Sequence, residues 1–427
     1  MDQQATAVIG AHGPSGETIT PSSGAARVRL VVVLGALIAL GPLTIDMYLP
    51  ALPAITADLL TTEASVQLTL TGTLLGLAVG QLVIGPLSDA FGRKRPLLIG
   101  AGVHVVASVL CALAPNIAVL GSLRVLQGAG AAAGMVVAMA VVRDLYIGRA
   151  AAMLLSRLIL VMGAAPIIAP TLGGALLGFT SWRGVFVALA VYGLVLIPIA
   201  ARLLPETLPP QRRRPARVGS TFRTYGGLLT DRVFVGLVLT AGLVMSAMFA
   251  YIGGSSFVFQ EQFGFDEQSF GLLFGAGAIF VIGASQLNAF LLRWFEPRQL
   301  LLAAVLAGAT AALLLLVGAL TGFGGLSGIL VPLWTLLFTI GISLPNAPAL
   351  ALTRHGEAAG TAASVLGAAQ FGIGGAVSPL VGVAGNDAVA MGAVMGATMA
   401  LALAVVVLMV RPWRLANMEA PVVCRRN

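Results

Sequence analysis

Charged side chains are scarce in this sequence of 427 residues: they make up 9% of the chain, whereas 58% of it is hydrophobic. Soluble globular proteins carry roughly 25% charged residues, so the deficit excludes a chain that is surrounded by water on all sides. Apolar runs of the roughly 20 residues needed to cross a bilayer repeat along nearly the whole sequence. They leave no room for a sizeable soluble domain, and we therefore expect an all-α membrane protein with many spans.

Cysteine and histidine are also scarce. The two cysteines, Cys111 in the third apolar run and Cys424 near the C-terminus, do not predict a native disulfide bridge. The three histidines, His12, His104 and His355, are scattered, so the sequence lacks the clusters typical of metal sites and catalytic centres. A Walker A loop for ATP is missing as well. We expect no enzyme activity, no cofactor and no bound metal.

Hydropathy divides the chain into twelve predicted spans. They cover roughly residues 28–50, 66–88, 97–114, 118–142, 153–178, 184–204, 233–258, 270–292, 299–320, 325–350, 359–383 and 388–410. With the N-terminus inside, the basic residues gather on the inner side, and Arg183 is the one basic residue on the outer side. This asymmetry predicts that both termini face the cytoplasm. It also assigns the net charge of +8 to contact with a lipid bilayer, not with nucleic acid.

One long hydrophilic stretch separates six spans from the other six. It covers residues 205–232 and contains Pro205, Glu206 and a run of three arginines. Paired halves with a site near the midplane are common in secondary transporters. We predict a disordered cytoplasmic tail over 1–27, a six-helix bundle over 28–204, a linker over 205–232, a second six-helix bundle over 233–410 and a tail over 411–427.

The connection between spans two and three reads GPLSDAFGRKR over residues 85–95. Its first glycine suits a close helix crossing and its second a tight turn, while Asp89 suits a helix N-terminus or an arginine such as Arg143. The order of residues resembles the signature of the major facilitator superfamily; a basic loop that only sets topology is the alternative. We predict a gate on the cytoplasmic side, formed by Gly85, Asp89, Gly92, Arg93, Lys94, Arg95 and Arg143.

Arg124 lies inside span four, in the segment LRVLQGAG over residues 123–130. This segment resembles a second motif of the same superfamily. An arginine at the centre of a span costs about 2.5–3.5 kcal/mol, so it must face a cavity or find a partner. On a helix it shares a face with Gln127, Met135 and Met139. Two roles stay open: bonding to the backbone of a neighbouring helix, and proton coupling.

Span five contains GAAPIIAPTLGG over residues 163–174. It resembles the antiporter motif of the superfamily, although Ala169 stands where that motif usually has glycine. Pro166 and Pro170 would bend the helix, and small residues would let another span approach closely. The residues that carry this motif are Gly163, Pro166, Pro170, Gly173 and Gly174. A bend that serves only packing is the alternative.

Asp46, in LTIDMYLPALP over residues 43–53, is the one acidic residue of 16 that lies well within a predicted span. An ionised carboxylate there costs a few kcal/mol, so Asp46 must bind a proton, pair with a cation or face water. At a rise of about 1.5 Å per residue, Asp46 and Arg124 lie at similar depth. We predict that Asp46 takes up a proton from outside as substrate leaves and releases it inward as substrate binds. A fixed ion pair with Arg124 is the alternative.

Taken together, these segments resemble the bicyclomycin and chloramphenicol resistance subfamily (Bcr/CflA) of drug:proton antiporters. The likeness is carried by residues 44–53, 143–146, 181–183 and 204–207, with weaker matches between 251 and 364. It implies a twelve-helix fold, efflux of drugs or toxic metabolites across the bacterial inner membrane, and antiport of protons. We expect a monomer.

Residue type alone predicts the substrate contacts, because hydrophobic drugs bind in apolar cavities with few polar groups. The candidates are Tyr48, Met135, Met139, Phe249, Tyr251, Phe257, Phe338, Asn346 and Gln370. For any one aromatic residue, packing in the core or against lipid is the alternative. A nutrient symporter shares the fold but usually carries more charge in its spans. We predict proton-coupled export of small hydrophobic or amphipathic compounds, with transport of an endogenous metabolite as the alternative.

Overall fold

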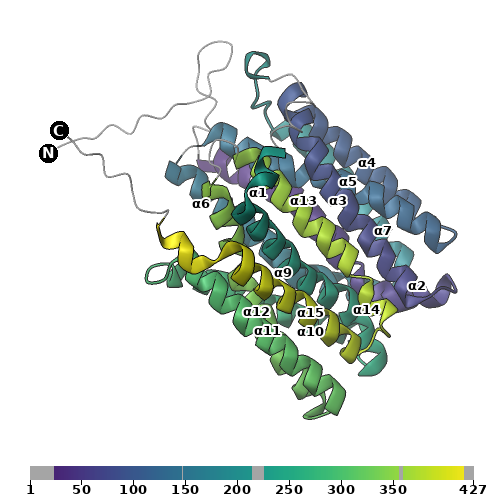
Figure 1. Ribbon diagram of the computed structural model, residues 1–427. Coiled ribbons are helices and arrows are strands. Elements are labelled where there is room, and N and C mark those ends of the chain that lie inside the picture. The colour runs from purple at the N-terminus through teal and green to yellow at the C-terminus, as the bar shows by residue number, and fades with distance from the viewer. Residues whose placement is uncertain (1–23, 147, 214–225, 355–358, 418–427) are drawn as a thin grey trace. The chain divides into compact units, whose positions relative to one another are not determined.

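The computed structural model describes residues 24–146, 148–213, 226–354 and 359–417, and these ranges contain helices and no strand (Figure 1). The predicted tails and the predicted linker lie partly outside them. Twelve long helices occur in the described ranges: α1 Gly24–Asp46, α3 Glu63–Phe91, α4 Lys94–Ala112, α5 Ile117–Leu145, α6 Gly148–Leu177, α7 Trp182–Leu203, α9 Arg232–Phe257, α10 Glu267–Leu291, α11 Pro297–Thr321, α12 Gly325–Arg354, α13 Ala359–Val377 and α15 Ala388–Val405.

The twelve predicted spans coincide with these twelve helices, so the all-α membrane fold is confirmed. Eleven stretches of the described chain are long and apolar enough to cross a membrane, and α6 contributes the shorter apolar part Ala164–Leu177. Several helices begin earlier than hydropathy predicts, because a polar cap extends them beyond the apolar run. The side chain of Asn116, for example, accepts a hydrogen bond from the amide of Val119 at 3.0 Å and starts α5.

The first span is not one continuous helix. α1 ends at Asp46, a short 3-10 helix η1 (Leu49–Ala51) follows, and α2 (Leu52–Asp58) completes the span. Prolines explain the break, because Pro50 has no N–H for the carbonyl of Asp46 and Pro53 has none for that of Leu49. Asp46 therefore sits at an interruption inside the membrane-spanning segment.

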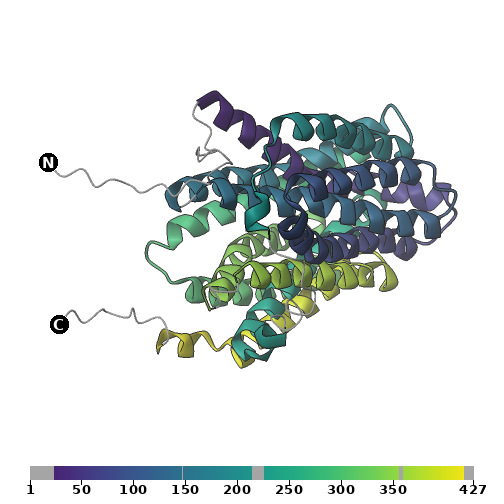
Figure 2. The ribbon, with the colours of Figure 1, turned by 90° about the horizontal axis from the view of Figure 1, so that it is seen from above.

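The chain forms two compact units. Unit 1 takes in the described residues of Met1–Val218 together with Ile252–Ala278. In it α5 packs against α3 and α4, and α4 packs against α7; these four helices run side by side in both views (Figures 1 and 2). A buried cluster joins α1, α5 and α7 through side chains such as Leu34, Ile38, Val137, Val141 and Leu196.

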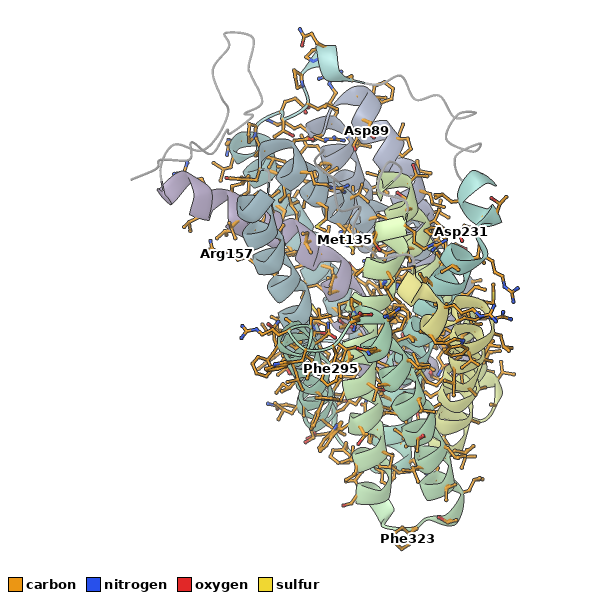
Figure 3. All side chains as sticks on the ribbon, turned by 60° about the vertical axis from the view of Figure 1, so that its left-hand side comes forward. Asp89, Met135, Arg157, Asp231, Phe295 and Phe323 are labelled. Carbon is orange, nitrogen blue, oxygen red and sulfur yellow. The ribbon has the colours of Figure 1, made fainter. Side chains whose placement is uncertain are left out.

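Unit 2 takes in the described residues of Gly219–Tyr251 and Ile279–Asn427. Its helix α11 packs against α12 and α15, and Phe323 lies on the turn between α11 and α12 (Figure 3). A hydrogen bond of 2.7 Å from Asn346 to Asn288 joins α12 to α10. Asp231, just before α9, forms an ion pair of 2.9 Å with Arg354 at the end of α12.

The helices of unit 1 run between two ends. The basic end is the one where the segment 91–94 joins α3 to α4 and where α7 terminates. The Trp182 end is the opposite one, where α2 is followed by α3 and where α7 begins.

Candidate functional site

Asp46 is buried at the break in the first span. Its exposed fraction is 3%, and it is the last residue of α1. Within the described ranges its carboxyl group takes part in none of the ion pairs, and no side-chain hydrogen bond reaches it. The carboxyl group is therefore buried without a counter-ion among the described residues, and negative charge is costly in such a place.

Arg124 is fully buried, and its contacts are with neutral groups. One guanidinium nitrogen, Nη1, donates to the carbonyl oxygen of Thr44 at 3.0 Å and to Oε1 of Gln127 at 2.7 Å. The guanidinium carbon lies 4.4 Å from the centre of the Tyr48 ring and 5.6 Å from that of Phe186. A cation over an aromatic face is attracted by the negative potential of the ring. Nε and Nη2 lack a hydrogen-bond partner in the part of the chain that the structure describes.

Asp46 and Arg124 thus lie at the same depth but do not pair. Arg124 contacts the backbone carbonyl of Thr44 and the ring of Tyr48, which stand on either side of Asp46 in the sequence. The Asp46 carboxyl group takes part in neither contact. The fixed ion pair that the sequence left open is absent from the described residues.

A chain of buried polar groups continues from Arg124. Gln127 donates to the hydroxyl of Ser108 at 2.8 Å, and that hydroxyl donates to the carbonyl oxygen of His104 at 2.7 Å. The ring of His104 and the hydroxyl of Thr44 share a hydrogen bond of 2.9 Å. We call Thr44, Tyr48, His104, Ser108, Arg124 and Gln127 the Arg124 cluster. It joins α1, α4 and α5, and His104 acts in it as a hydrogen-bonded packing residue.

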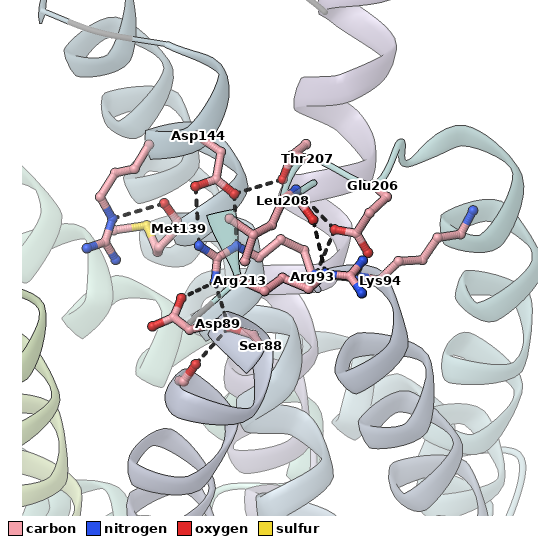
Figure 4. A network of polar contacts seen from close by, with 12 residues as sticks. Ser88, Asp89, Arg93, Lys94, Met139, Asp144, Glu206, Thr207, Leu208 and Arg213 are labelled. Atoms are coloured by element: carbon pink, nitrogen blue, oxygen red, sulfur yellow. Dashed lines mark hydrogen bonds and ion pairs between the residues drawn. The ribbon is translucent and has the colours of Figure 1, made fainter. Parts of the chain in front are cut away.

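A second polar network lies at the basic end and is centred on Arg93 (Figure 4). The guanidinium group binds Asp144 through two nitrogens, at 2.8 Å and 3.2 Å, and donates to Asp89 at 2.5 Å and Ser88 at 2.9 Å. Burial lowers the pKa of Arg93, but the hydrogen bonds to Asp144 and Asp89 outweigh that effect and raise it above its usual value. The side chain remains a cation that ties α3 to α5.

The segment after α7 completes this network. Glu206 accepts hydrogen bonds from the amides of Arg93 at 2.8 Å and Lys94 at 3.3 Å, where α4 begins. A carboxylate is favoured there because the first amides of a helix lack partners and carry partial positive charge. Thr207 donates to Asp144 at 2.8 Å. Sequence reasoning missed these roles, although residues 143–146 and 204–207 carried part of the resemblance.

Gly92 is required by the turn that brings these groups together. Its φ of +91° is rare for other residues, and a Cβ there would lie 2.5 Å from Oε2 of Glu206. Lys94 is half-buried and Arg95 is exposed.

Two details of the predicted gate are wrong. Asp89 pairs with Arg93, because the turn at Gly92 folds that arginine back over α3, whereas Nε of Arg143 donates to the carbonyl oxygen of Met139 at 3.2 Å. Gly85 does not mark a close helix crossing: a Cβ there would meet no described atom within 4 Å.

The glycines of span five allow close packing. Pro166 and Pro170 lie inside α6, which also contains Gly163. A Cβ at Gly173 would overlap the carbonyl oxygen of Met47, next to Asp46. A Cβ at Gly174 would lie 2.5 Å from the carbonyl oxygen of Glu267. The end of α6 is therefore held against the break in the first span.

The predicted substrate contacts fall into two groups. The buried side chains are Tyr48, Phe249, Tyr251, Phe257 and Asn346, and the partly exposed ones are Met135, Met139, Phe338 and Gln370. Tyr48 bonds to Thr69 at 2.6 Å under Arg124, and Phe249 packs on Phe371 at 5.9 Å. Packing accounts for Tyr48 and Phe249, while the partly exposed group retains free surface.

Sequence comparison places the chain among known transporters. The family model described as Major Facilitator Superfamily matches residues 34–379. A Bacillus subtilis protein, the uncharacterized MFS-type transporter YdgK, is 40% identical over 91% of this chain and 94% of its own length. A Haemophilus influenzae bicyclomycin resistance protein homolog is 30% identical over 82% of this chain and 88% of its own length. The Escherichia coli multidrug resistance protein MdtL is 31% identical over 80% of this chain and 85% of its own length.

Solved structures agree with the sequence comparison at the level of the fold. A bacterial homolog of the human lysosomal transporter Spinster, in an inward-facing and occupied conformation, has a TM-score of 0.72. It shares 16% of its residues with this chain, and the match covers 93% of this chain and 98% of that one. The chain belongs to the major facilitator superfamily.

Proposed function

We propose that this transporter exports drugs or other small hydrophobic and amphipathic compounds across the bacterial inner membrane in exchange for protons. Asp46 carries the proposal. It is a buried carboxyl group with no counter-ion among the described residues, and it stands at a break in a membrane-spanning segment. Such a group is expensive to keep charged in a membrane, so gaining and losing a proton is the exchange to which it is suited.

The relatives support export as the direction of transport. Two of them are named for resistance to bicyclomycin or to multiple drugs. The segment 163–174 resembles the antiporter motif, and its glycine Gly173 packs directly against the residue after Asp46. We infer that α6 and Asp46 move together during exchange.

The network around Arg93 supports a gate at the basic end. Because Arg93, Asp89, Asp144 and Glu206 are interlocked, the turn 91–94 is held rigidly against α5 and the segment after α7. We propose that this end faces the cytoplasm, and that the turn closes and opens the cytoplasmic side. The partly exposed Met135, Met139, Phe338 and Gln370 are the proposed substrate contacts.

Transport into inside-out vesicles tests the function. With an imposed pH gradient, acid inside, wild-type vesicles are expected to accumulate one or more members of a panel of amphenicols, bicyclic antibiotics and cationic dyes. Asp46→Asn should abolish accumulation and leave the Tm of the purified protein within about 2 °C of wild type. Accumulation by wild type that ignores the gradient would rule out antiport, and uphill transport by Asp46→Asn would remove Asp46 from the mechanism.

A panel that fails entirely, while an endogenous metabolite accumulates, would instead identify a metabolite transporter.

A further inference from the structure

The Trp182 end of unit 1 is held together by side chains that bond to backbone carbonyls. Gln67 in α3 donates to the carbonyl oxygen of Gly253 at 3.0 Å. Ser256 in α9 donates to that of Leu49 at 2.8 Å. Gln260 lies in the π-helix η3 (Val258–Gln262), and it donates to the carbonyl oxygen of Pro50 at 3.4 Å and to the hydroxyl of Ser256 at 2.6 Å.

These bonds join parts of the sequence that are far apart. Residues 252–278 follow the hydrophilic linker, yet they belong to unit 1 together with the first six spans. Gln67 and Ser256 have no exposed surface, so their bonds are shielded from water. A buried amide or hydroxyl that loses its partner is costly, and so the bonds of Gln67 and Ser256 are made or broken together with the packing around them.

The backbones of α6 and α10 also approach each other closely at the Trp182 end. A Cβ at Gly174 would lie 2.5 Å from the carbonyl oxygen of Glu267, and one at Gly271 would lie 2.9 Å from that of Pro170. Thr171 adds a bond of 3.4 Å to the carbonyl oxygen of Gly271. α6 and α10 therefore close against each other at this end without bulky side chains between them.

The acceptors belong to the break that follows Asp46. Leu49 and Pro50 are in η1, where the carbonyl of Leu49 accepts from the amide of Leu52 but not from residue 53, which is a proline without an N–H. The bonds from Ser256 and Gln260 therefore fix the position of the segment 47–51. Because Asp46 is the residue before this segment, the same bonds help to keep its carboxyl group buried.

We propose that Gln67, Ser256 and Gln260 form a latch that closes the Trp182 end and positions the break after Asp46, and that the latch must open for Asp46 to be reached from that side. The three side chains are positioning residues. The role of Asp46 in this proposal rests on the proposed function, whereas the closure of the Trp182 end does not.

Spin labels and cysteine accessibility test the latch in full-length protein in liposomes. Both experiments start from a protein in which Cys111→Ser and Cys424→Ser remove the native cysteines. In the first, the distance between spin labels on cysteines at the exposed positions Leu60 and Gln268 reports whether this end is closed. In the second, labelling of Met47→Cys reports access to the residue after Asp46. Ser256→Ala and Gln260→Leu should each add a population with a longer label distance. They should also raise labelling of Met47→Cys by a membrane-impermeant maleimide by about fivefold, the change in an equilibrium that loss of one hydrogen bond typically causes.

Ser255→Ala is the matched control. Ser255 is equally buried and adjacent in sequence, but among the described residues its hydroxyl bonds only to Ile252 of its own helix, at 3.4 Å. The Ser255→Ala variant should leave the label distance and the maleimide labelling unchanged. Ser256→Thr, which keeps a hydroxyl, should behave like wild type. Unchanged distances and labelling in the Ser256→Ala, Gln260→Leu double variant would overturn the latch, whether or not the wild-type protein transports against a pH gradient. If gradient-driven transport fails but Ser256→Ala and Gln260→Leu still change the label distance and the labelling of Met47→Cys, the result would count against the proposed function alone.

Discussion

At the scale of single residues, the unusual feature of this protein is a buried arginine that is stabilised by neutral groups. Arg124 lies under the ring of Tyr48 and donates to a carbonyl and an amide oxygen, while no described carboxylate neutralises it. At the similar depth that the sequence predicts for the two residues, an ion pair with Asp46 was the alternative to proton exchange. That pair is absent from the described residues, and the proposed exchange of a proton at Asp46 depends on this absence, because a tight ion pair would hold the carboxyl group in its charged form.

The Arg124 cluster depends on Gln127, which accepts from Arg124 and donates to Ser108. Gln127→Leu would leave a buried cation and a buried hydroxyl each short of one partner. We expect the free energy of unfolding to fall by about 1–3 kcal/mol, measured as a lower Tm in detergent. Ser122→Ala is the control on the same helix, because Ser122 is exposed and, in the part of the chain that the structure describes, bonds only to Ala118 one turn earlier. Equal effects of the two substitutions would show that the cluster adds no stability.

At the scale of helices, small residues determine which elements approach one another. Gly173 lets α6 contact the backbone at Met47, and Gly92 lets the turn 91–94 fold under Glu206. Proline determines where the first span breaks, since Pro50 and Pro53 each remove a backbone hydrogen-bond donor. These sites could be found in the sequence, but their partners could not.

Two glycine substitutions should have opposite effects on stability. Gly173→Ala forces α6 away from the carbonyl of Met47 and should destabilise the protein by about 1–3 kcal/mol. Gly102→Ala, in α4, has open space around its new methyl group and should stabilise the protein by about 0.5–1 kcal/mol, because glycine is a poor helix former. The Tm of each variant, compared with that of wild type, measures these changes in stability. A Gly173→Ala protein as stable as the Gly102→Ala protein would contradict the close contact between α6 and the first span.

The ion pair between Asp231 and Arg354 gives unit 2 a predictable response to acid. Burial raises the pKa of Asp231, but its hydrogen bonds to Arg354 and to the amides of Phe234 and Val233 outweigh this and hold the pKa below the ordinary value of 3.8. The stabilisation is therefore present above that ordinary value and is lost as the pH falls through the lowered pKa. Asp231→Asn should lower the free energy of unfolding by about 0.5–1 kcal/mol at pH 7.

The difference in Tm between wild type and Asp231→Asn, followed from pH 7 down to the acid limit of the protein, checks this sign. It should shrink only at the acid end of the range. A difference that grows on acidification would show that Asp231 is stabilising in its protonated form.

At the scale of the whole molecule, the orientation in the membrane determines the direction of transport. The positive-inside rule places the turn 91–94 inside and residues such as Leu60 and Phe323 outside. Leu60 and Phe323 are 93% and 82% exposed, so cysteines there should react with an impermeant maleimide in intact cells. Arg95→Cys should react only after permeabilisation. The reverse pattern would invert the proposed direction of transport.

The number and limits of the spans could be predicted from the sequence, because hydropathy depends only on which residues are adjacent in the chain. All twelve predicted spans coincide with a long helix, and differences arise mainly at capped ends such as Asn116 and at the break after Asp46. The motif residues were also recognisable. The sequence motif predicts a gate that includes Arg93, whereas it predicts no role for Asp144, Glu206 or Thr207, which join the network around Arg93 only in the folded chain.

The sequence by itself thus determined that this is a membrane transporter with twelve helices, which residues are too polar to lie freely in lipid, and where prolines interrupt a helix. Only the tertiary structure decided which of those residues meet. Helical spacing gives the depth of a side chain but not the rotation of its helix relative to a distant one, so Arg124 could be placed level with Asp46 and still face Thr44 and Tyr48. Contacts across long stretches of sequence, such as that of Ser256 with Leu49, leave no periodic signal in either segment.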